Sequence, residues 1–159
     1  MDLGHFYFLQ DKFFVDFDDP TLMRNKEGYR QGRPCFYAFM DVSNQIYWMI
    51  PVSSQVEKYR RFYQNRITRY GRCDNIVFGE LLGYERAFLI QNMFPTTSNY
   101  IDSEYTHSTA NVPVRLDGAF EKILVQKAKK VLALTRQGVK LVYPDILMIE
   151  QNLINRSVE

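Results

Sequence analysis

The sequence predicts an α+β fold in which antiparallel strands pack against amphipathic helices. Two apolar runs on either side of Ser43-Asn44 predict a β-hairpin. Two later segments carry apolar residues at helical spacing, which is typical of amphipathic helices. The 159 residues contain no internal repeat, low-complexity segment or linker. We therefore expect one domain, residues 1–159, with a single hydrophobic core.

Composition narrows the class of protein. Hydrophobic residues make up 46% of the chain, which favours a folded domain over a disordered one. No apolar run is long enough to span a bilayer and the first residues lack a signal-peptide pattern, so we expect a cytoplasmic protein that has no membrane contact. Cys35 and Cys73 fit neither a disulfide scaffold nor a zinc site and are expected as free thiols.

The first half of the chain predicts three strands. The aromatic run His5–Leu9 predicts the first strand, and residues 11–32 predict a loop with room for a helical turn. Cys35–Val42 and Gln45–Val52 predict the two strands of the hairpin, each apolar on both faces.

The second half predicts further strands and two helices. Residues 74–78 and 86–93 are expected as strands, the latter ended by Phe94-Pro95, and residues 96–113 as a long surface loop. Asp117-Gly118 leads into a helix that continues to about Thr135 and stops at Gly138. A last helix begins with Pro144 in its first turn and continues through Ile154.

The segment Pro51–Lys58 is the candidate anion site. Ser54 and Glu57 have the spacing of a capping box, which predicts that a helix begins at Ser54. The free amides of a helix start, the Ser54 hydroxyl and the Lys58 ammonium group would then surround one anion, such as a phosphate. The plainer alternative is that the box only starts a helix.

Two segments are basic. Residues 58–72 contain six Lys or Arg and no acid, and residues 117–140 contain six Lys or Arg and two acids. Residues 55–70 combine an apolar stripe with a second stripe of basic and polar side chains at the same helical spacing. Such faces suit the backbone of RNA, although two solvated helix faces would have the same pattern.

Several catalytic classes find no support. The chain has no phosphate-binding loop with Lys-Ser/Thr, no zinc-ligand spacing and no Gly-x-Ser-x-Gly motif. His5 and His107 could form an acid–base pair only if the fold brought them together. RNA cleavage without a metal needs a base, an acid and donors that stabilise the extra charge on the phosphate. Lys58 could donate a proton, but no base is visible, and we expect no metal or cofactor.

The order and spacing of several motifs resemble a known family. These motifs are Phe6-Tyr7, Arg33-Pro34, the run Gln45–Ser54 that is followed by a Lys, and Phe88–Pro95, which is similar to an Asn-Met-x-Pro strand. The sequence resembles the endoribonuclease toxins of type III toxin–antitoxin systems, the ToxN/AbiQ/CptN family, and within it the CptN branch. The resemblance covers residues 5–60 well and residues 86–100 moderately.

The resemblance implies a compact antiparallel β-barrel of the SH3-like or PemK type with attached helices. It implies metal-independent, sequence-selective cleavage of cellular mRNA to 2′,3′-cyclic phosphate and 5′-OH ends. It also implies inhibition by an RNA antitoxin, a pseudoknot cut from a repeat array, which forms a closed protein–RNA assembly with the toxin. A barrel RNase of the MazF/PemK kind with a protein antitoxin is one alternative, and a non-catalytic RNA-binding module is another.

The resemblance also assigns residues. The catalytic residues are expected to be Ser53, Ser54, Lys58 and Arg33. The family often has Lys two residues after the Ser pair, where this chain has Val56, so Arg60 is the alternative to Lys58. With the basic segments, the RNA-binding residues are expected to be Tyr7, Arg60, Arg61, Arg69, Arg72, Lys127 and Lys130.

Overall fold

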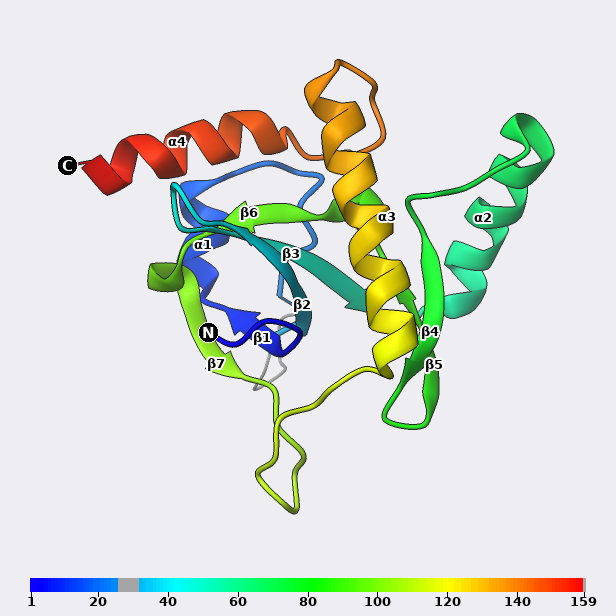
Figure 1. The fold of residues 1–159 in the computed structure, drawn as a ribbon, viewed down its shortest axis with the longest axis horizontal. Coiled ribbons are helices and arrows are strands. Elements are labelled where there is room, and N and C mark those ends of the chain that lie inside the picture. The colour runs from blue at the N-terminus through cyan, green and yellow to red at the C-terminus, as the bar shows by residue number, and fades with distance from the viewer. Residues whose placement is uncertain (26–31, 159) are drawn as a thin grey trace.

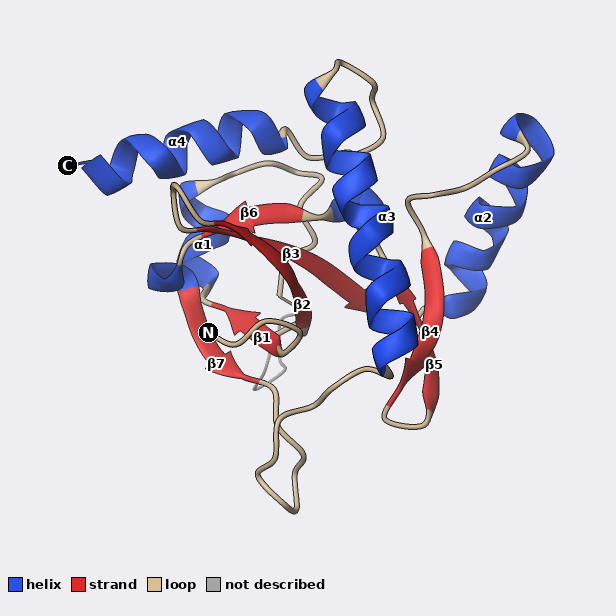
Figure 2. Ribbon diagram, viewed as in Figure 1, coloured by secondary structure: helices blue, strands red, loops and turns tan. Residues whose placement is uncertain are grey.

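The structure is a computed structural model that describes residues 1–25 and 32–158. Within these residues the fold is α+β, with one seven-stranded antiparallel sheet and four α-helices (Figures 1 and 2). Residues 26–31 of the predicted loop 11–32 lie outside the described part. No helix in the described part is long and apolar enough to cross a membrane.

The sheet has a central path of six strands and one strand beside it. The order along the path is β4-β5-β3-β2-β1-β7, and β6 pairs with β3 off this path. In the described residues the sheet is not closed, so the barrel is not confirmed. The strands are β1 (Phe6–Leu9), β2 (Cys35–Asp41), β3 (Ile46–Ser53), β4 (Val77–Leu81), β5 (Tyr84–Phe88), β6 (Phe94–Thr96) and β7 (Ile101–Glu104).

Strand β3 makes the most pairings. One of its edges pairs with β2 along most of its length. Its other edge is shared, because β6 pairs with Tyr47–Met49 and β5 pairs with Val52 and Ser53. The short 3₁₀ segment Ile90–Asn92 carries the chain from β5 to β6. Both edges of β3 are thus covered, and all of its residues except Tyr47 are buried.

The four helices are α1 (Asp11–Asp16), α2 (Val56–Tyr70), α3 (Gly118–Arg136) and α4 (Ile146–Val158). Helix α3 crosses the sheet near β2, α4 lies against β6, and α2 lies against β5 at one end of the molecule (Figure 1). Most buried side chains belong to one core, which contains Phe6, Phe36, Trp48 and Phe88. A second, smaller core lies under α2 and consists of Tyr59, Cys73, Ile76, Ala87 and Leu89.

The hairpin β2–β3, the first strand and the three long helices confirm the predictions from sequence. Gly138 follows α3 with a φ of 90°, as expected of a residue that ends a helix. Pro144, however, precedes the last helix, which begins at Ile146.

The predicted strands after α2 were partly wrong. The expected strand 74–78 begins only at Val77 and continues to Leu81. The expected strand 86–93 ends at Phe88, and Phe94 and Pro95 lie inside β6. Pro95 is tolerated there because β3 is the one partner of β6 among the described strands, so the other edge of β6 needs no donor. The expected loop 96–113 contains β7 and a 3₁₀ turn, Ser98–Tyr100.

The predicted capping box is also wrong. Helix α2 begins at Val56, its N-cap residue is Gln55, and no side chain caps it. The hydroxyl that takes part in this turn belongs to Ser53, whose Oγ accepts the Gln55 amide at 3.2 Å. The chain therefore makes a Ser turn before the helix, which moves the helix start past Ser54.

Gly79 allows α3 to pack closely on the β4–β5 hairpin. A Cβ atom at Gly79 would lie 2.2 Å from Cζ of Phe120, near the start of α3. The Phe120 ring in turn contacts Phe88 of β5, with ring centroids 5.2 Å apart. One glycine thus lets one aromatic ring hold the hairpin against the main core.

We predict that Gly79→Ala lowers the free energy of unfolding by about 1–3 kcal/mol, because the added methyl group overpacks the Phe120 ring. Urea unfolding followed by circular dichroism measures this change. The cost is expected to shrink in a Phe120→Leu background, since the two sites are coupled.

The matched control is Gly118→Ala. A Cβ atom at Gly118 meets nothing within 4 Å, so this change is expected to be neutral or stabilising by less than about 1 kcal/mol. Equal effects of the two substitutions would contradict the packing role of Gly79.

Candidate functional site

A pocket of about 360 Å³ opens where β3 ends. Its wall combines the residues before β2, the end of β3, the tip of the β4–β5 hairpin and the residue after β7. The polar side chains that line it are Arg33, Ser54, Tyr84, Arg86 and Tyr105. Two guanidinium groups and three hydroxyls therefore surround one cavity of a size typical for small ligands.

Arg33 is held in place by the hairpin beneath it. Its Nη1 donates to the Val52 carbonyl at 3.0 Å, and its backbone amide donates to Oδ1 of Asn25 at 3.3 Å. Its Nε is buried and has no acceptor among the described residues. Arg33 is half-buried and lines the pocket, so a guanidinium group fixed in this way is suited to bind an anion there.

Strand β5 brings Tyr84 and Arg86 to the pocket by alternation. Residues two apart on a strand share a face, so Tyr84, Arg86 and Phe88 lie on one side of the hairpin. Glu85 and Ala87 lie on the other side, where Glu85 forms an ion pair with Arg60 of α2 and Ala87 enters the small core. The hairpin thus presents Arg86 to the pocket and carries its two acids, Glu80 and Glu85, on the other face.

The two predicted serines take different positions. Ser54 is exposed and lines the pocket. Ser53 is 3% exposed and pairs with Ala87, on the side of the hairpin that faces α2. Because its hydroxyl accepts the Gln55 amide, Ser53 shapes the turn that presents Ser54.

The two candidates for the basic residue after the serines do not line the pocket. Lys58 is exposed and its Nζ lies 5.4 Å from the centre of the Tyr59 ring. Arg60 stacks over Phe78 at 4.4 Å and is paired with Glu85. The cation that the pocket adds to Arg33 is instead Arg86.

The pocket is chemically suited to a phosphodiester. No His, Asp or Glu is among the described residues that line it, so neither guanidinium is neutralised by an acid of the pocket wall. Two arginines can bind two phosphate oxygens and stabilise added negative charge, while hydroxyls donate to the remaining oxygen atoms or exchange a proton.

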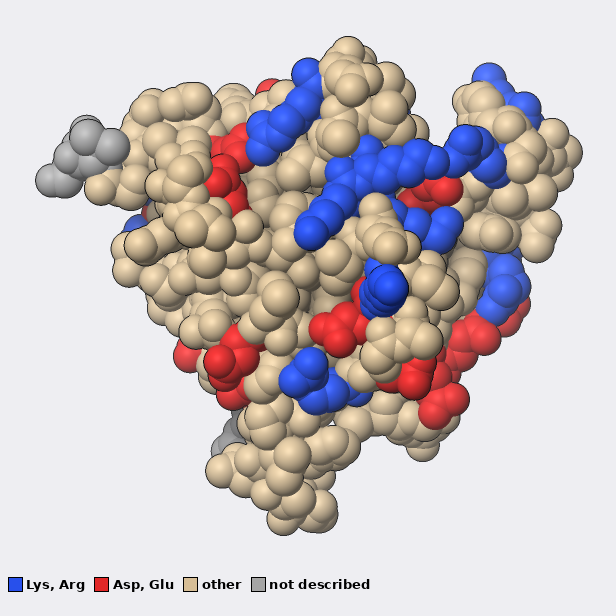
Figure 3. Space-filling model, viewed as in Figure 1, with Lys and Arg blue, Asp and Glu red and all other residues tan. Residues whose placement is uncertain are grey.

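The two basic segments meet away from this pocket. Arg72, just past α2, and Lys127 and Lys130 on α3 all approach Asp74, at 2.5, 3.4 and 3.5 Å. Burial raises the pKa of Asp74, but the Arg72 hydrogen bond and the charges of Lys130, Arg72 and Lys127 outweigh it and lower the pKa. Figure 3 shows Lys and Arg side chains running across α3 toward α2.

The remaining residues predicted to bind RNA have different surroundings. Arg61 and Arg69 are exposed on the outer face of α2, as the basic stripe predicted. Tyr7 is only 5% exposed, and its hydroxyl accepts the Asp2 amide at 2.6 Å. Its ring is therefore part of the core and is not presented to a base.

His5 and His107 are in different settings. His107 is exposed on the segment after β7, whereas Nδ1 of His5 contacts Glu104 and its Nε2 lies 3.2 Å from Nη1 of Arg115. A carboxylate only accepts and a guanidinium only donates, so Nδ1 carries the proton and Nε2 accepts. Both ring nitrogens of His5 are thus engaged, which leaves neither available as a catalytic base.

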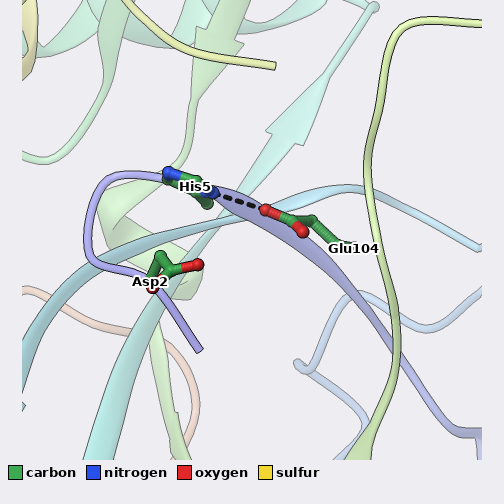
Figure 4. A group of neighbouring side chains, drawn as sticks. All are labelled: Asp2, His5 and Glu104. Atoms are coloured by element: carbon green, nitrogen blue, oxygen red, sulfur yellow. Dashed lines mark hydrogen bonds and ion pairs between the residues drawn. The ribbon is translucent and has the colours of Figure 1, made fainter. Parts of the chain in front are cut away.

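Among the described residues, the side chains of Asp2, His5 and Glu104 form a group with the ligand types that could hold a metal ion (Figure 4). Their ligand atoms lie within 4.8 Å of one another. The contact between His5 and Glu104 would have to break before either could bind an ion. The arrangement fits a hydrogen bond that ties the residue before β1 to β7.

Sequence reasoning missed Tyr84, Arg86 and Tyr105. Tyr84 and Arg86 could have been found from the turn Leu82-Gly83, which joins β4 to β5. Both residues of this turn have positive φ, at 53° and 83°. Such a two-residue turn fixes the register of the hairpin and pairs Gly79 with Arg86. Tyr105 follows a strand of four residues that the sequence did not reveal.

No family model matches the chain, and a search of curated proteins returned no match.

The strand beneath Arg33 contains a thiol that reports on the rigidity of the site. Burial raises the pKa of Cys35 to about 12, against the opposing effect of the nearby Arg33 charge. We predict that alkylation of Cys35 by iodoacetamide stays slow as the pH rises from about 8 to about 10, because the thiol remains protonated and covered. The rate is measured by mass spectrometry in a Cys73→Ala variant.

Unfolding in urea should release the thiol, whose pKa then returns to its ordinary value, so alkylation should become fast over the same pH range. Rapid alkylation of the native protein would mean that the start of β2 opens readily, and that Arg33 has no fixed support.

Proposed function

We propose that the chain is a metal-independent endoribonuclease in which the pocket at the end of β3 binds the scissile phosphate. The observation that carries this proposal is the convergence of Arg33 and Arg86 with the Ser54 hydroxyl on one cavity whose described lining contains no acid. The resemblance of residues 5–60 to type III toxins supports it independently. A PemK-type barrel is part of the proposal, with β2 and β3 as its central hairpin.

The reaction would use positioning and charge more than a dedicated base. The ribose 2′-oxygen attacks the adjacent phosphorus and loses its proton, and the bond to the 5′-oxygen breaks as that oxygen gains a proton. Arg33 and Arg86 bind the phosphate and stabilise the added charge of the transition state. The described groups of the wall that can exchange a proton are the hydroxyls of Ser54, Tyr84 and Tyr105. The products are a 2′,3′-cyclic phosphate and a 5′-OH.

We further propose the partners that the resemblance implies. The substrate is cellular mRNA in the cytoplasm, and the inhibitor is a pseudoknot RNA that occupies the pocket and contacts the basic faces of α2 and α3. The exposed row Lys58, Arg61 and Arg69 supports a polyanion partner, because it supplies cations along a helix that begins beside the pocket.

We predict that the purified protein cleaves a labelled RNA in the presence of EDTA, and that Arg33→Ala and Arg86→Ala each lower kcat by about 10²–10³-fold. Ser54→Ala should lower it less, by about tenfold, since one hydroxyl donor is lost. Gel analysis of cleavage measures the rates, and enzymatic labelling of the product ends tests for 5′-OH and cyclic phosphate.

The matched control is Arg156→Ala, which makes the same change on α4 at the far side of the core (Figure 1). Lys58→Ala discriminates between the two site assignments: a loss as large as that of Arg33→Ala would return Lys58 to the catalytic group. RNA that is bound but left intact by the wild-type protein would favour a non-catalytic binding module.

The nature of the antitoxin has its own test. We predict that the DNA upstream of the coding sequence contains tandem short repeats followed by a terminator, and that RNA copied from them copurifies with the protein. Sequencing that DNA and extracting the nucleic acid from purified protein provide the two measurements. A small open reading frame in place of the repeats would favour the alternative with a protein antitoxin.

A further inference from the structure

A second cavity, of about 590 Å³, lies at the opposite end of α2 from the first. It is bounded by the last turns of α2, the link from Gly71 to β4, α3 and residues 139–143. Gly71 makes this arrangement possible, because its φ of 75° turns the chain back at the end of the helix. The basic and aromatic side chains that line the cavity are Arg66, Tyr70, Arg72, Lys130, Lys140 and Tyr143.

Arg66 is a cation without a carboxylate partner among the described residues. Its Nη1 donates to Oδ1 of Asn75 at 3.0 Å and to Oε1 of Gln91 at 2.7 Å, and its Nη2 donates to the Tyr143 hydroxyl at 2.8 Å. Asn75 and Gln91 are buried, at 8% and 3% exposed. Three neutral acceptors fix the guanidinium group and leave its charge uncompensated.

The rest of the cavity wall adds positive charge. Asp74 is the one acid among the described lining residues, and it is shared by Arg72 and Lys130 together with the neighbouring Lys127. Lys140 is exposed at the rim. The C-terminal end of α2 contributes roughly half a negative charge, which is smaller than the excess of full cations on the wall.

Two aromatic rings stand at the mouth of the cavity. Tyr143 is 51% exposed and Tyr70 is 65% exposed. An exposed ring beside several cations is the combination that binds a nucleotide, with the base stacked on the ring and the phosphate on the cations. The volume is within the range of pockets that enclose such a ligand.

We propose that this cavity binds one nucleotide of an RNA strand and anchors the strand whose scissile phosphate lies in the first pocket, an inference that rests on the proposed ribonuclease function. The 15 residues of α2 span about 22 Å between the two pockets. At about 3.4 Å per stacked nucleotide, an RNA strand needs about seven nucleotides to reach from one to the other. Arg61 and Arg69 are exposed on α2, between its two ends.

The test compares substrates of two lengths. With an RNA of about twelve nucleotides, Tyr143→Ala and the double variant Lys130→Ala/Lys140→Ala are expected to raise KM about tenfold and to leave kcat unchanged, because stacking or phosphate contacts are lost outside the reacting centre. With an RNA of about three nucleotides, which is too short to span α2, both variants should have the KM of the wild-type protein.

Binding without cleavage is measured in parallel. The probe is a fluorescent 2′-O-methyl RNA of about twelve nucleotides, which lacks the attacking hydroxyl, and its Kd is followed by anisotropy against salt. The double variant should weaken binding about tenfold and reduce the slope of log Kd against log salt by about 0.7 for each lysine that contacts a phosphate. Tyr143→Phe keeps the ring and should bind within about threefold of the wild-type protein.

The matched control is Lys122→Ala, an exposed lysine of α3 that does not line the cavity. Thermal unfolding of each variant excludes loss of the fold as the cause of weaker binding. If the cavity variants bind the RNA probe as tightly as Lys122→Ala does, the anchoring role is overturned.

Two further outcomes are informative. One distinguishes a free nucleotide from an RNA strand as the ligand, and the other distinguishes the anchoring role from the proposed ribonuclease function. Tight binding of free 5′-AMP that the double variant loses, with RNA binding unchanged, would assign the cavity to free nucleotides and overturn its RNA role. If the wild-type protein leaves RNA intact but the cavity variants still weaken its binding, the anchor is supported and the ribonuclease function fails.

Discussion

The pairing of β3 is the constraint on which the rest of the structure depends. It pairs with β2 along most of one edge, and its other edge is divided between β6 and β5. Trp48, Met49 and Ile50 are at most 1% exposed, so the centre of the strand is also the centre of the core. Because β5 pairs only with the last two residues of β3, the β4–β5 hairpin projects beyond the sheet and forms a wall there. The first pocket exists because of this division.

The projecting hairpin has two faces with different partners. One face presents Tyr84 and Arg86 to the pocket and receives the Phe120 ring over Gly79. The other face packs on α2 through the ring of Phe78, which contacts Tyr63 at 5.6 Å. Because successive side chains of a strand point to opposite faces, a strand of five residues separates the polar cavity from the apolar contact. The charge of Arg86 is kept in the pocket because the acid beside it, Glu85, faces away.

Much of the fold could be predicted from local patterns, and much of the site could not. The hairpin 35–52 and the three long helices follow from periodicity within single segments. Strand β6 has only three residues, one of them Pro95, and it exists because β3 offers a free edge that lies far away in sequence. Arg33 and Ser54 were predicted to belong to one site, and both line the first pocket. Arg86 was not predicted to belong to this site. Its position depends on the pairing of β5 with β3, which a local sequence pattern does not indicate.

The small core beneath α2 gives this helix a degree of independence. Tyr59, Cys73, Ile76, Ala87 and Leu89 form a cluster of their own, apart from the aromatic core of the sheet. Segments that pack on a separate cluster can open with a free energy below that of global unfolding. The outer face of α2 is therefore a surface on which substitutions can accumulate at little cost to the sheet. Sequence divergence is therefore expected to concentrate on this face, while the scaffold of the pocket is retained.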